Sequence, residues 1–255
     1  MVHQFFDPAN AAAFNTLADK TDSKFEVHYF GLHGLSGTIR TILAVSGAKF
    51  VSIAPAEGTW VPKYKPHTPF GVLPNLRETS ADGTLVVNIT ESDAIERYLS
   101  RKFGYLGKTA HEELLVSQFV AANNAMMTTL VKDYIAQREN LELKAANKEK
   151  LIATTIPTWI EYHEKHLSEN PAAKEGKHGN GHYVGNSLSL ADLKAYQLIG
   201  ILQDMIGDDL INKEKTPALL KVKETVEAIP SLQAWKATED YKAMSERNFQ
   251  ALGFH

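Results

Sequence analysis

The chain has 255 residues and a mass of 28.2 kDa, and 44% of its residues are hydrophobic, which is enough for a full buried core. Its formal net charge at pH 7 is −3 and it has no long basic run, so nucleic acid is excluded as the expected partner. It contains no cysteine, no recognisable signal peptide and no apolar stretch of about 20 residues, so we expect a cytoplasmic protein without a membrane partner.

The first hundred residues alternate strand and helix signals. Residues 1–23 contain a run of alanines without a strong hydrophobic period, and we expect an N-terminal extension that packs late or stays mobile. Segment 24–30 alternates and is rich in aromatic and β-branched residues, which predicts a strand. Apolar residues recur at helical spacing over 35–47, and 49–53 predicts a second strand. This order favours a parallel pair with a right-handed crossover.

The next segment predicts a loop and then a hairpin. Residues 54–69 carry four prolines and predict an irregular loop. Pro74 begins the following strand, and an Asp-Gly pair at 82–83 is a strong hairpin signal before the return strand at 84–88. Helical spacing resumes over 91–103. The whole region therefore predicts a four-stranded mixed sheet in the order βαβ, loop, ββα.

Pro74 is unusual at the start of a strand, because proline fixes its own φ and has no backbone N–H. A cis bond between Leu73 and Pro74 would leave the peptide groups of Leu73 free to bind an extended, peptide-like ligand. The alternative is a trans proline at an edge or turn, which is the commoner geometry.

The remainder of the chain predicts helices only. Apolar residues step by three and four over 111–134, and a second series over 150–167 contains Pro157, where we expect a kink. Ser189 and Asp192 form a capping box, in which the Asp192 carboxylate reaches back to the Ser189 N–H and starts a third helix. Two further helices follow prolines near the C-terminus.

Five short motifs stand in order along the chain: His28-Tyr29-Phe30, Arg40, Leu73-Pro74, Glu91-Ser92-Asp93-Ala94-Ile95, and Ser189 with Asp192. Together they resemble the cytosolic glutathione transferases, in particular the tyrosine-type, sigma-like members, over roughly residues 24–240. The resemblance implies an α/β thioredoxin-like βαβ-ββα domain at 24–106 that binds glutathione. An all-α domain at 107–255 would follow it, bind the second substrate and form the dimer.

The resemblance makes Tyr29 the catalytic residue. The glutathione thiol has a pKa of about 8.5 and is mostly protonated at neutral pH, so a hydroxyl donor near the sulfur would stabilise the reactive thiolate. A tyrosine with a pKa of about 10 keeps its proton while it donates. Two alternatives stay open. Tyr29 could only pack at the strand end, or Ser36 could activate the thiol, as a serine does in other branches of the family.

The resemblance also assigns residues that bind glutathione. They are Trp60, Lys65, Leu73, Pro74, Glu91 and Ser92. The backbone before the proline would pair with the cysteinyl amide, and the helix start at Glu91 and Ser92 would hold the γ-glutamyl end, where free N–H groups and the helix dipole favour a carboxylate. The loop residues would lie near the glycyl carboxylate. Glutathione is then a co-substrate, and no other cofactor is expected.

No metal site is predicted, because the paired histidines lack further convergent ligands. They are His163 and His166, and His178 and His182. The leading function is conjugation of glutathione to a small electrophilic substrate. Val72, where relatives often carry glutamine, and a long linker at 75–91 favour the alternative of a non-catalytic glutathione-binding or scaffold protein. An isomerase or peroxidase that uses the same thiolate is a further possibility.

The resemblance and the 111–134 helix together predict a homodimer. Val116, Val120 and Met127 lie outside its main apolar stripe, and Ala121 and Ala125 leave room for close approach of a second helix. A helix that is apolar on two sides has to bury its second side. The alternative is that the extension at 1–23 covers it within one chain.

Overall fold

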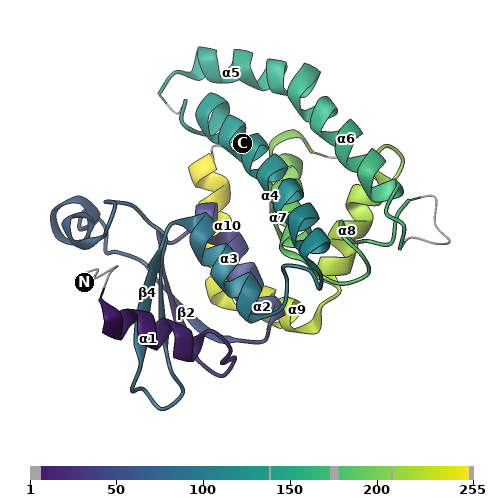
Figure 1. Cartoon of the computed structure of the whole chain (residues 1–255). Helices are drawn as coiled ribbons and strands as arrows, with labels where there is room; N and C mark the ends of the chain where they lie inside the picture. The colour runs from purple at the N-terminus through teal and green to yellow at the C-terminus, as the bar shows by residue number, and fades with distance from the viewer. Residues whose placement is uncertain (1–6, 138, 173–177, 208, 253–255) are drawn as a thin grey trace. The chain divides into compact units, whose positions relative to one another are not determined.

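The computed structural model describes residues 7–137, 139–172, 178–207 and 209–252, and its chain divides into two compact units (Figure 1). The first unit contains the residues up to Gly104 together with Pro230–Asn248. The second contains Tyr105–Ile229 and the residues after Asn248. The last helices of the chain thus group with the N-terminal unit. The domain limits expected at 106 and 107 remain a prediction.

A four-stranded sheet forms the centre of the first unit. Its strands are β1 (Lys24–His28), β2 (Lys49–Ile53), β3 (Asn75–Thr79) and β4 (Val86–Thr90). They are arranged in the order β2-β1-β3-β4, with β1 parallel to β2 and antiparallel to β3, and with β3 antiparallel to β4. The predicted mixed sheet is therefore confirmed. The first strand ends earlier than expected, so that Tyr29 follows it directly.

One face of the sheet carries the core of the first unit. Phe25 and Val27 on β1, with Leu76 on β3, are at most 1% exposed. The helices α2 (Gly37–Val45) and α3 (Ser92–Lys102) pack against each other, and their isoleucine and leucine side chains are fully buried. A short 3₁₀ turn, η1 (Gly34–Ser36), leads into α2. The loop after β2 contains two further short helical turns, η2 (Trp60–Tyr64) and η3 (Lys65–His67).

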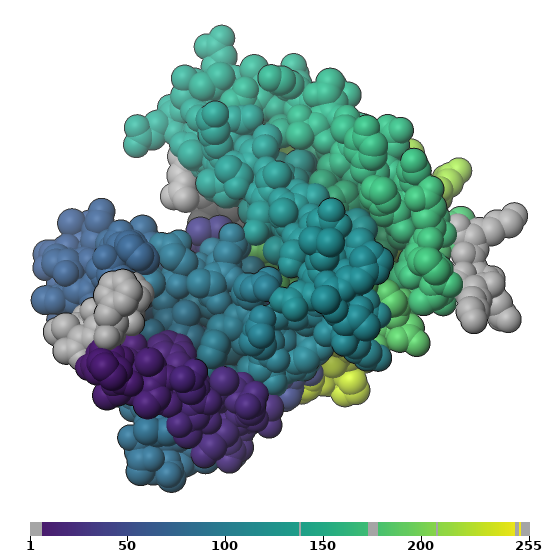
Figure 2. Space-filling model, in the orientation of Figure 1, coloured from purple at the N-terminus to yellow at the C-terminus, as the bar shows by residue number. Residues whose placement is uncertain are grey.

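The N-terminal extension contains a helix that the sequence pattern does not predict. Helix α1 (Pro8–Leu17) lies on the surface of the first unit (Figure 2). Its Leu17 is buried against Val87 of β4. The Lys102 ammonium donates to the carbonyl oxygens of Leu17 and Lys20, at the C-terminal end of this helix. A helix C-terminus favours a positive charge, so Lys102 fixes the extension to α3.

The second unit is helical, as predicted. Its elements are α4 (Ala110–Leu130) with η4 (Val131–Ile135), α5 (Leu141–Lys150), η5 (Leu151–Thr155) with α6 (Ile156–Ser168), α7 (Leu190–Ile206) and α8 (Pro217–Glu227). Pro157, where a kink is expected, lies in the first turn of α6, directly after the π-type turn η5, and α5 is a helix that the sequence pattern does not predict. The Asp192 carboxylate accepts from the Ser189 N–H at 2.7 Å, which confirms the capping box.

The buried line of α4 differs from the predicted apolar stripe. Met126 and Leu130 of the predicted stripe are buried and Ala122 is exposed, whereas Val116 and Asn123, outside the stripe, are buried as well. Helix α4 packs against α7. Val116 is therefore covered within the chain, so the expectation that it lies on a second, outer apolar face is wrong.

Helix α4 and its continuation, Ala110–Ile135, are long and apolar enough to span a membrane, although the sequence pattern predicts no such segment. By length and a mean hydropathy of 1.3 alone, this segment is able to cross a bilayer. Core helices of soluble proteins pass the same test. Because α4 packs along α7, we treat it as a helix of this unit.

After the second unit the chain returns to the first with α9 (Pro230–Lys236) and α10 (Glu239–Leu252). Helix α9 packs on α2, and the Ser231 hydroxyl donates to the Val45 carbonyl at 3.3 Å. These contacts bring the C-terminal residues to the side of the sheet on which Tyr29 lies.

Candidate functional site

Tyr29 lies just after β1 and is 8% exposed. Its backbone N–H donates to the Ile53 carbonyl at 3.1 Å, which continues the β1 and β2 ladder by one residue. Its hydroxyl oxygen accepts a hydrogen bond from the Leu35 N–H at 3.2 Å. Burial raises the pKa of Tyr29 above its ordinary value, against smaller opposing effects of the Leu35 N–H and the charge of Arg40. The hydroxyl therefore keeps its proton at neutral pH.

Gly34 fits closely against this hydroxyl. Its φ is +41°, and a Cβ atom at this position would lie 2.7 Å from the Tyr29 hydroxyl oxygen and 2.9 Å from its ring. Because this contact is shorter than real Cβ contacts, any larger residue would displace the ring. Gly34 and Leu35 together define the position of the Tyr29 hydroxyl.

Arg40 lies beneath this turn and is 1% exposed. Its guanidinium donates to the Leu32 carbonyl at 2.8 Å and to the Ser52 hydroxyl at 3.0 Å, and its Cζ atom is 6.0 Å from the centre of the Tyr29 ring. Burial lowers the pKa of Arg40 to about 10, so it remains charged at pH 7. Arg40 thus supplies a fixed positive charge behind the tyrosine.

Ser36, the alternative to Tyr29, is fully buried. Its hydroxyl donates to the His33 carbonyl at 2.9 Å, within the turn that begins α2. The hydroxyl proton of Ser36 is therefore already used inside the protein, whereas the Tyr29 hydroxyl is held through its oxygen.

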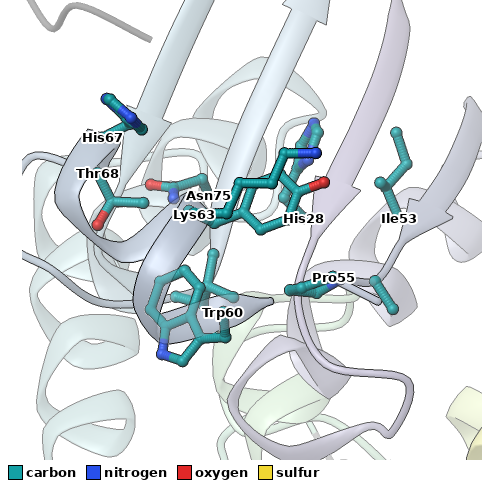
Figure 3. A pocket seen from close by; sticks show the side chains of 11 residues that line it. His28, Ile53, Pro55, Trp60, Lys63, His67, Thr68 and Asn75 are labelled. Carbon is teal, nitrogen blue, oxygen red and sulfur yellow. The ribbon is translucent and has the colours of Figure 1, made fainter. Parts of the chain in front are cut away.

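The bond between Leu73 and Pro74 is cis, as considered from the sequence. Within the described residues, the peptide groups of Leu73 make no backbone hydrogen bond. Leu73 lines a cavity of about 430 Å³ between the sheet and the loop that follows β2 (Figure 3). The other lining residues are His28, Ile53, Ala54, Pro55, Trp60, Lys63, Tyr64, His67, Thr68 and Asn75.

The structure separates the two loop residues that the sequence singles out. Trp60 lines the cavity with Leu73, and its ring meets Phe30 edge-on at 5.8 Å. Lys65 is exposed and does not line it, whereas Lys63 and His67 do. Sequence reasoning missed these two because the proline-rich loop gives no regular spacing by which to choose among its basic residues.

Glu91 and Ser92 lie at the N-terminal end of α3. Glu91 has a φ of +70°, a conformation that residues other than glycine rarely adopt, and its carbonyl accepts from the Ile95 N–H at 3.0 Å. Ser92 begins the helix and is partly buried. The first N–H groups of α3 therefore lie beside both side chains, where the helix dipole favours a carboxylate.

A second, smaller cavity of about 100 Å³ is lined by Tyr29 and Arg40 from the N-terminal part of the sequence and by residues of α10, near the C-terminus. The residues from α10 are Asp240, Met244 and Arg247. Three of the predicted site residues line one of these two cavities, whereas Lys65, Pro74, Glu91 and Ser92 line neither. Trp60 and Leu73 share the larger cavity, and Tyr29 lines the smaller one.

The chain is similar to known proteins over most of its length. Residues 127–239 match a family described as the C-terminal domain of glutathione S-transferase. The chain is 30% identical over 216 residues to Glutathione S-transferase 1 of Ascaris suum, which covers 84% of this chain and 96% of the relative. It is 26% identical over 216 residues to Hematopoietic prostaglandin D synthase of Gallus gallus, over 83% of this chain and 94% of that one.

Solved structures give the same result. The glutathione S-transferase from Ascaris lumbricoides superposes with a TM-score of 0.64 and 30% identity, over 84% of this chain and 96% of that one. With the four-stranded mixed sheet and the helices that follow it, this likeness establishes the fold class. A thioredoxin-like N-terminal domain precedes a helical C-terminal domain.

Proposed function

We propose that Tyr29 activates the thiol of the substrate glutathione in this chain, which belongs to the glutathione S-transferase family and is a glutathione transferase. The hydrogen bond from the Leu35 N–H to the Tyr29 hydroxyl oxygen is the observation that carries this proposal. It occupies the oxygen as an acceptor and leaves the O–H free to donate to sulfur.

The expected gain follows from the strength of such a bond. A hydrogen bond to a charged group contributes about 1.5–3 kcal/mol, which lowers the pKa of the bound thiol by about one to two units. An ordinary thiol pKa of about 8.5 would then fall to near neutrality, and most of the bound glutathione would be thiolate. The raised pKa of Tyr29 fits this role, because the donor has to remain protonated.

The remaining residues are proposed to hold glutathione beside Tyr29. The peptide groups of Leu73, before Pro74, make no backbone hydrogen bond to the part of the chain that the structure describes, and they would pair with the cysteinyl residue, as a strand does. The start of α3, at Glu91 and Ser92, would bind the γ-glutamyl carboxylate. Glutathione would be the co-substrate, without a further cofactor.

For the glycyl carboxylate we propose Trp60 with the basic residues of its loop. Lys65 is the residue expected from the sequence, and Lys63 and His67 join it because they line the same cavity as Trp60. A carboxylate in this cavity would meet the positive charge of Lys63, whereas Lys65 would have to reach it from outside the lining. The relative effects of Lys63→Ala and Lys65→Ala on the KM for glutathione decide between them.

The second substrate is proposed to be a small electrophile that the thiolate attacks, with loss of a leaving group or addition to a double bond. The similarity to Hematopoietic prostaglandin D synthase favours one second candidate, an isomerase that uses the same thiolate without consuming glutathione. We further propose that the protein acts in the cytoplasm as a homodimer.

The test is the rate of conjugation to a chlorinated aromatic substrate in Tyr29→Phe, with Tyr162→Phe as a control. Tyr162 is 57% exposed and belongs to the helical unit. We expect kcat to fall about 10- to 100-fold in Tyr29→Phe, as the loss of about 1.5–3 kcal/mol requires. Glutathione binding, measured by calorimetry, should persist. An undiminished kcat in Tyr29→Phe would remove Tyr29 from the mechanism, and binding without turnover across many electrophiles would support a scaffold instead.

A further inference from the structure

The C-terminal segment Pro230–Asn248 packs onto the turn that links Tyr29 to α2. This turn, residues 30–34, contains the glycine that contacts the Tyr29 hydroxyl, and Leu35 follows it directly. Both parts belong to the first compact unit, although about 200 residues of sequence separate them.

His33 is the first point of contact. Its Nε2 atom lies 2.9 Å from the Ser245 hydroxyl, and its ring lies 4.8 Å from that of Tyr241 and 6.0 Å from that of Trp235. The side chain is 7% exposed. Burial, with smaller contributions from Arg40 and Lys236, lowers the pKa of His33 to about 4, so it is neutral at pH 7.

Gly31 is the second point of contact. The Arg247 Nε donates to the Gly31 carbonyl, and a Cβ atom on Gly31 would lie 3.2 Å from that nitrogen. The guanidinium therefore covers the backbone two residues after Tyr29. The same arginine lines the small cavity that Tyr29 and Arg40 share.

These contacts continue to the reacting group through a short path. The carbonyl of His33 accepts from the Ser36 N–H at 3.0 Å, which closes the turn around Gly34 and Leu35. A shift of His33 would therefore move the Leu35 N–H away from the Tyr29 hydroxyl. The Arg40 guanidinium and the Ser36 hydroxyl hold the turn from α2, at the carbonyls of Leu32 and His33, and α10 adds the contacts at Gly31 and at the His33 ring.

We propose that Ser245 and Arg247 are positioning residues, through which helix α10 holds the 30–34 turn so that the Tyr29 hydroxyl points its proton at the glutathione sulfur. This inference rests on the proposed role of Tyr29. It makes α10 a part of the catalytic unit, although the helix need not touch the reacting atoms.

Several charges face this region and would contribute to any dependence on pH. Arg40 lies on α2, Lys236 on α9, and Asp240 and Arg247 on α10, while His33 belongs to the turn itself. Replacing Arg247 by lysine keeps the net charge of this group. A comparison of Arg247→Lys with Arg247→Ala therefore separates the loss of the charge from the loss of the guanidinium contact.

The experiment compares Arg247→Ala, Arg247→Lys and Ser245→Ala, with Lys242→Ala as the control on the same helix. The Lys242 ammonium is 59% exposed and pairs only with Glu239 among the described residues. We expect kcat in Arg247→Ala and Ser245→Ala to fall about 3- to 10-fold, and the acidic limb of the kcat/KM profile to move up by about half a pH unit to one unit. KM for glutathione and the melting temperature should change little, Arg247→Lys should retain more activity, and Lys242→Ala should be unchanged.

A second comparison separates this inference from the proposed function. In a Tyr29→Phe background, Arg247→Ala should cause no further loss of kcat, because the hydroxyl that it positions is already gone. An equal loss in both backgrounds would overturn the positioning role. A full rate in Tyr29→Phe alone would overturn the proposed function first. If Tyr29→Phe is slow but Ser245→Ala and Arg247→Ala keep the wild-type pH profile, only the role of α10 is overturned.

Discussion

The Leu35 N–H donates to the Tyr29 hydroxyl oxygen at 3.2 Å, although Leu35 belongs to the turn before α2 and Tyr29 follows β1. A phenol can accept one hydrogen bond and donate another. Because the donor on this side is the backbone N–H of Leu35, substitutions of Leu35 other than proline leave it in place. The direction of the remaining O–H is then set by the shape of the turn, and above all by Gly34.

The first prediction concerns that glycine. In Gly34→Ala the new Cβ would lie 2.7 Å from the Tyr29 hydroxyl oxygen, so the ring has to move. We expect kcat for conjugation to fall by about 10-fold or more, approaching the value of Tyr29→Phe. Steady-state rates at saturating glutathione measure this.

Gly47→Ala is the matched control for Gly34→Ala. Gly47 also has a positive φ, +64°, but a Cβ there would meet nothing within 4 Å. Both variants thus carry a backbone cost of about 1–2 kcal/mol, and only one touches Tyr29. Equal kcat values for the two would show that the contact with Gly34 is irrelevant to the chemistry.

The second prediction separates Tyr29 from Ser36. Because the Ser36 hydroxyl is fully buried and donates to the His33 carbonyl, Ser36→Ala should keep kcat within about threefold of wild type while losing about 1 kcal/mol of stability. The rate and the urea midpoint are measured on the same preparation. A large loss of kcat with normal stability would transfer the thiol activation to Ser36.

Local signals in the sequence predict much of the fold. The alternation of 24–30, the turn at 82–83 and the capping box of Ser189 with Asp192 each depend on neighbours within a few residues. The residues around Pro74 alone leave the commoner trans geometry open, and the resemblance to the glutathione transferases favours the cis bond that the structure contains.

The features that sequence reasoning missed depend on distant residues. Helix α1 has little amphipathic pattern of its own and is held by Val87 and Lys102, far along the chain. The contact of Arg247 with Gly31 joins residues 216 positions apart. No local period reports such a pair, so the part of the candidate site that comes from α10 was not predictable from spacing.

The third prediction concerns the buried ion pair of Lys102 and Glu78, next to the N-terminal extension. The Lys102 ammonium pairs with Glu78 at 2.9 Å, with both side chains at most 1% exposed, and the Tyr98 hydroxyl donates to the same carboxylate at 2.6 Å. Lys102→Met would leave the Glu78 charge buried without its partner. We expect a loss of about 3–5 kcal/mol in the free energy of unfolding.

The control for this prediction removes both charges. In the double variant Lys102→Met with Glu78→Gln, the buried site holds no ion, and most of the lost stability should return. Urea unfolding followed by circular dichroism gives the values. If the double variant is as unstable as Lys102→Met, the loss comes from the contacts with α1 rather than from the unpaired carboxylate.

The fourth prediction is a dependence of stability on pH that His163 contributes. Burial first, and then the nearby His166, lower the pKa of His163 to about 4. Its Nδ1 atom lies 2.7 Å from the Tyr183 hydroxyl, and the side chain is 4% exposed. Because the unfolded chain binds this proton near pH 6.5 and the folded chain does not, stability is lost as the pH falls from 6.5 towards 4.

Between pH 7 and pH 5 this residue should remove about 2 kcal/mol from the free energy of unfolding. His163→Gln should therefore lose less stability than wild type over the same interval. His166→Gln, at a side chain 49% exposed, should keep most of the wild-type dependence, because burial contributes more than His166 to the lowered pKa of His163. Urea titrations at both pH values measure the difference. Parallel pH dependence in wild type and His163→Gln would contradict it.

The last prediction is that the protein is a homodimer formed through the outer face of α4. Although Val116 is buried within the chain, Ala121 and Ala125 are exposed. Ala125 also lines a cavity of about 660 Å³ between α4 and α6, with Phe119 and Tyr162. Small exposed residues beside an aromatic cavity allow the close approach of a second copy.

Sedimentation at micromolar concentration should give twice the chain mass of 28.2 kDa. Ala125→Arg should shift the protein to the monomer, and Ala145→Arg, at an exposed alanine of α5, should not. A wild-type species at the mass of one chain would exclude the dimer.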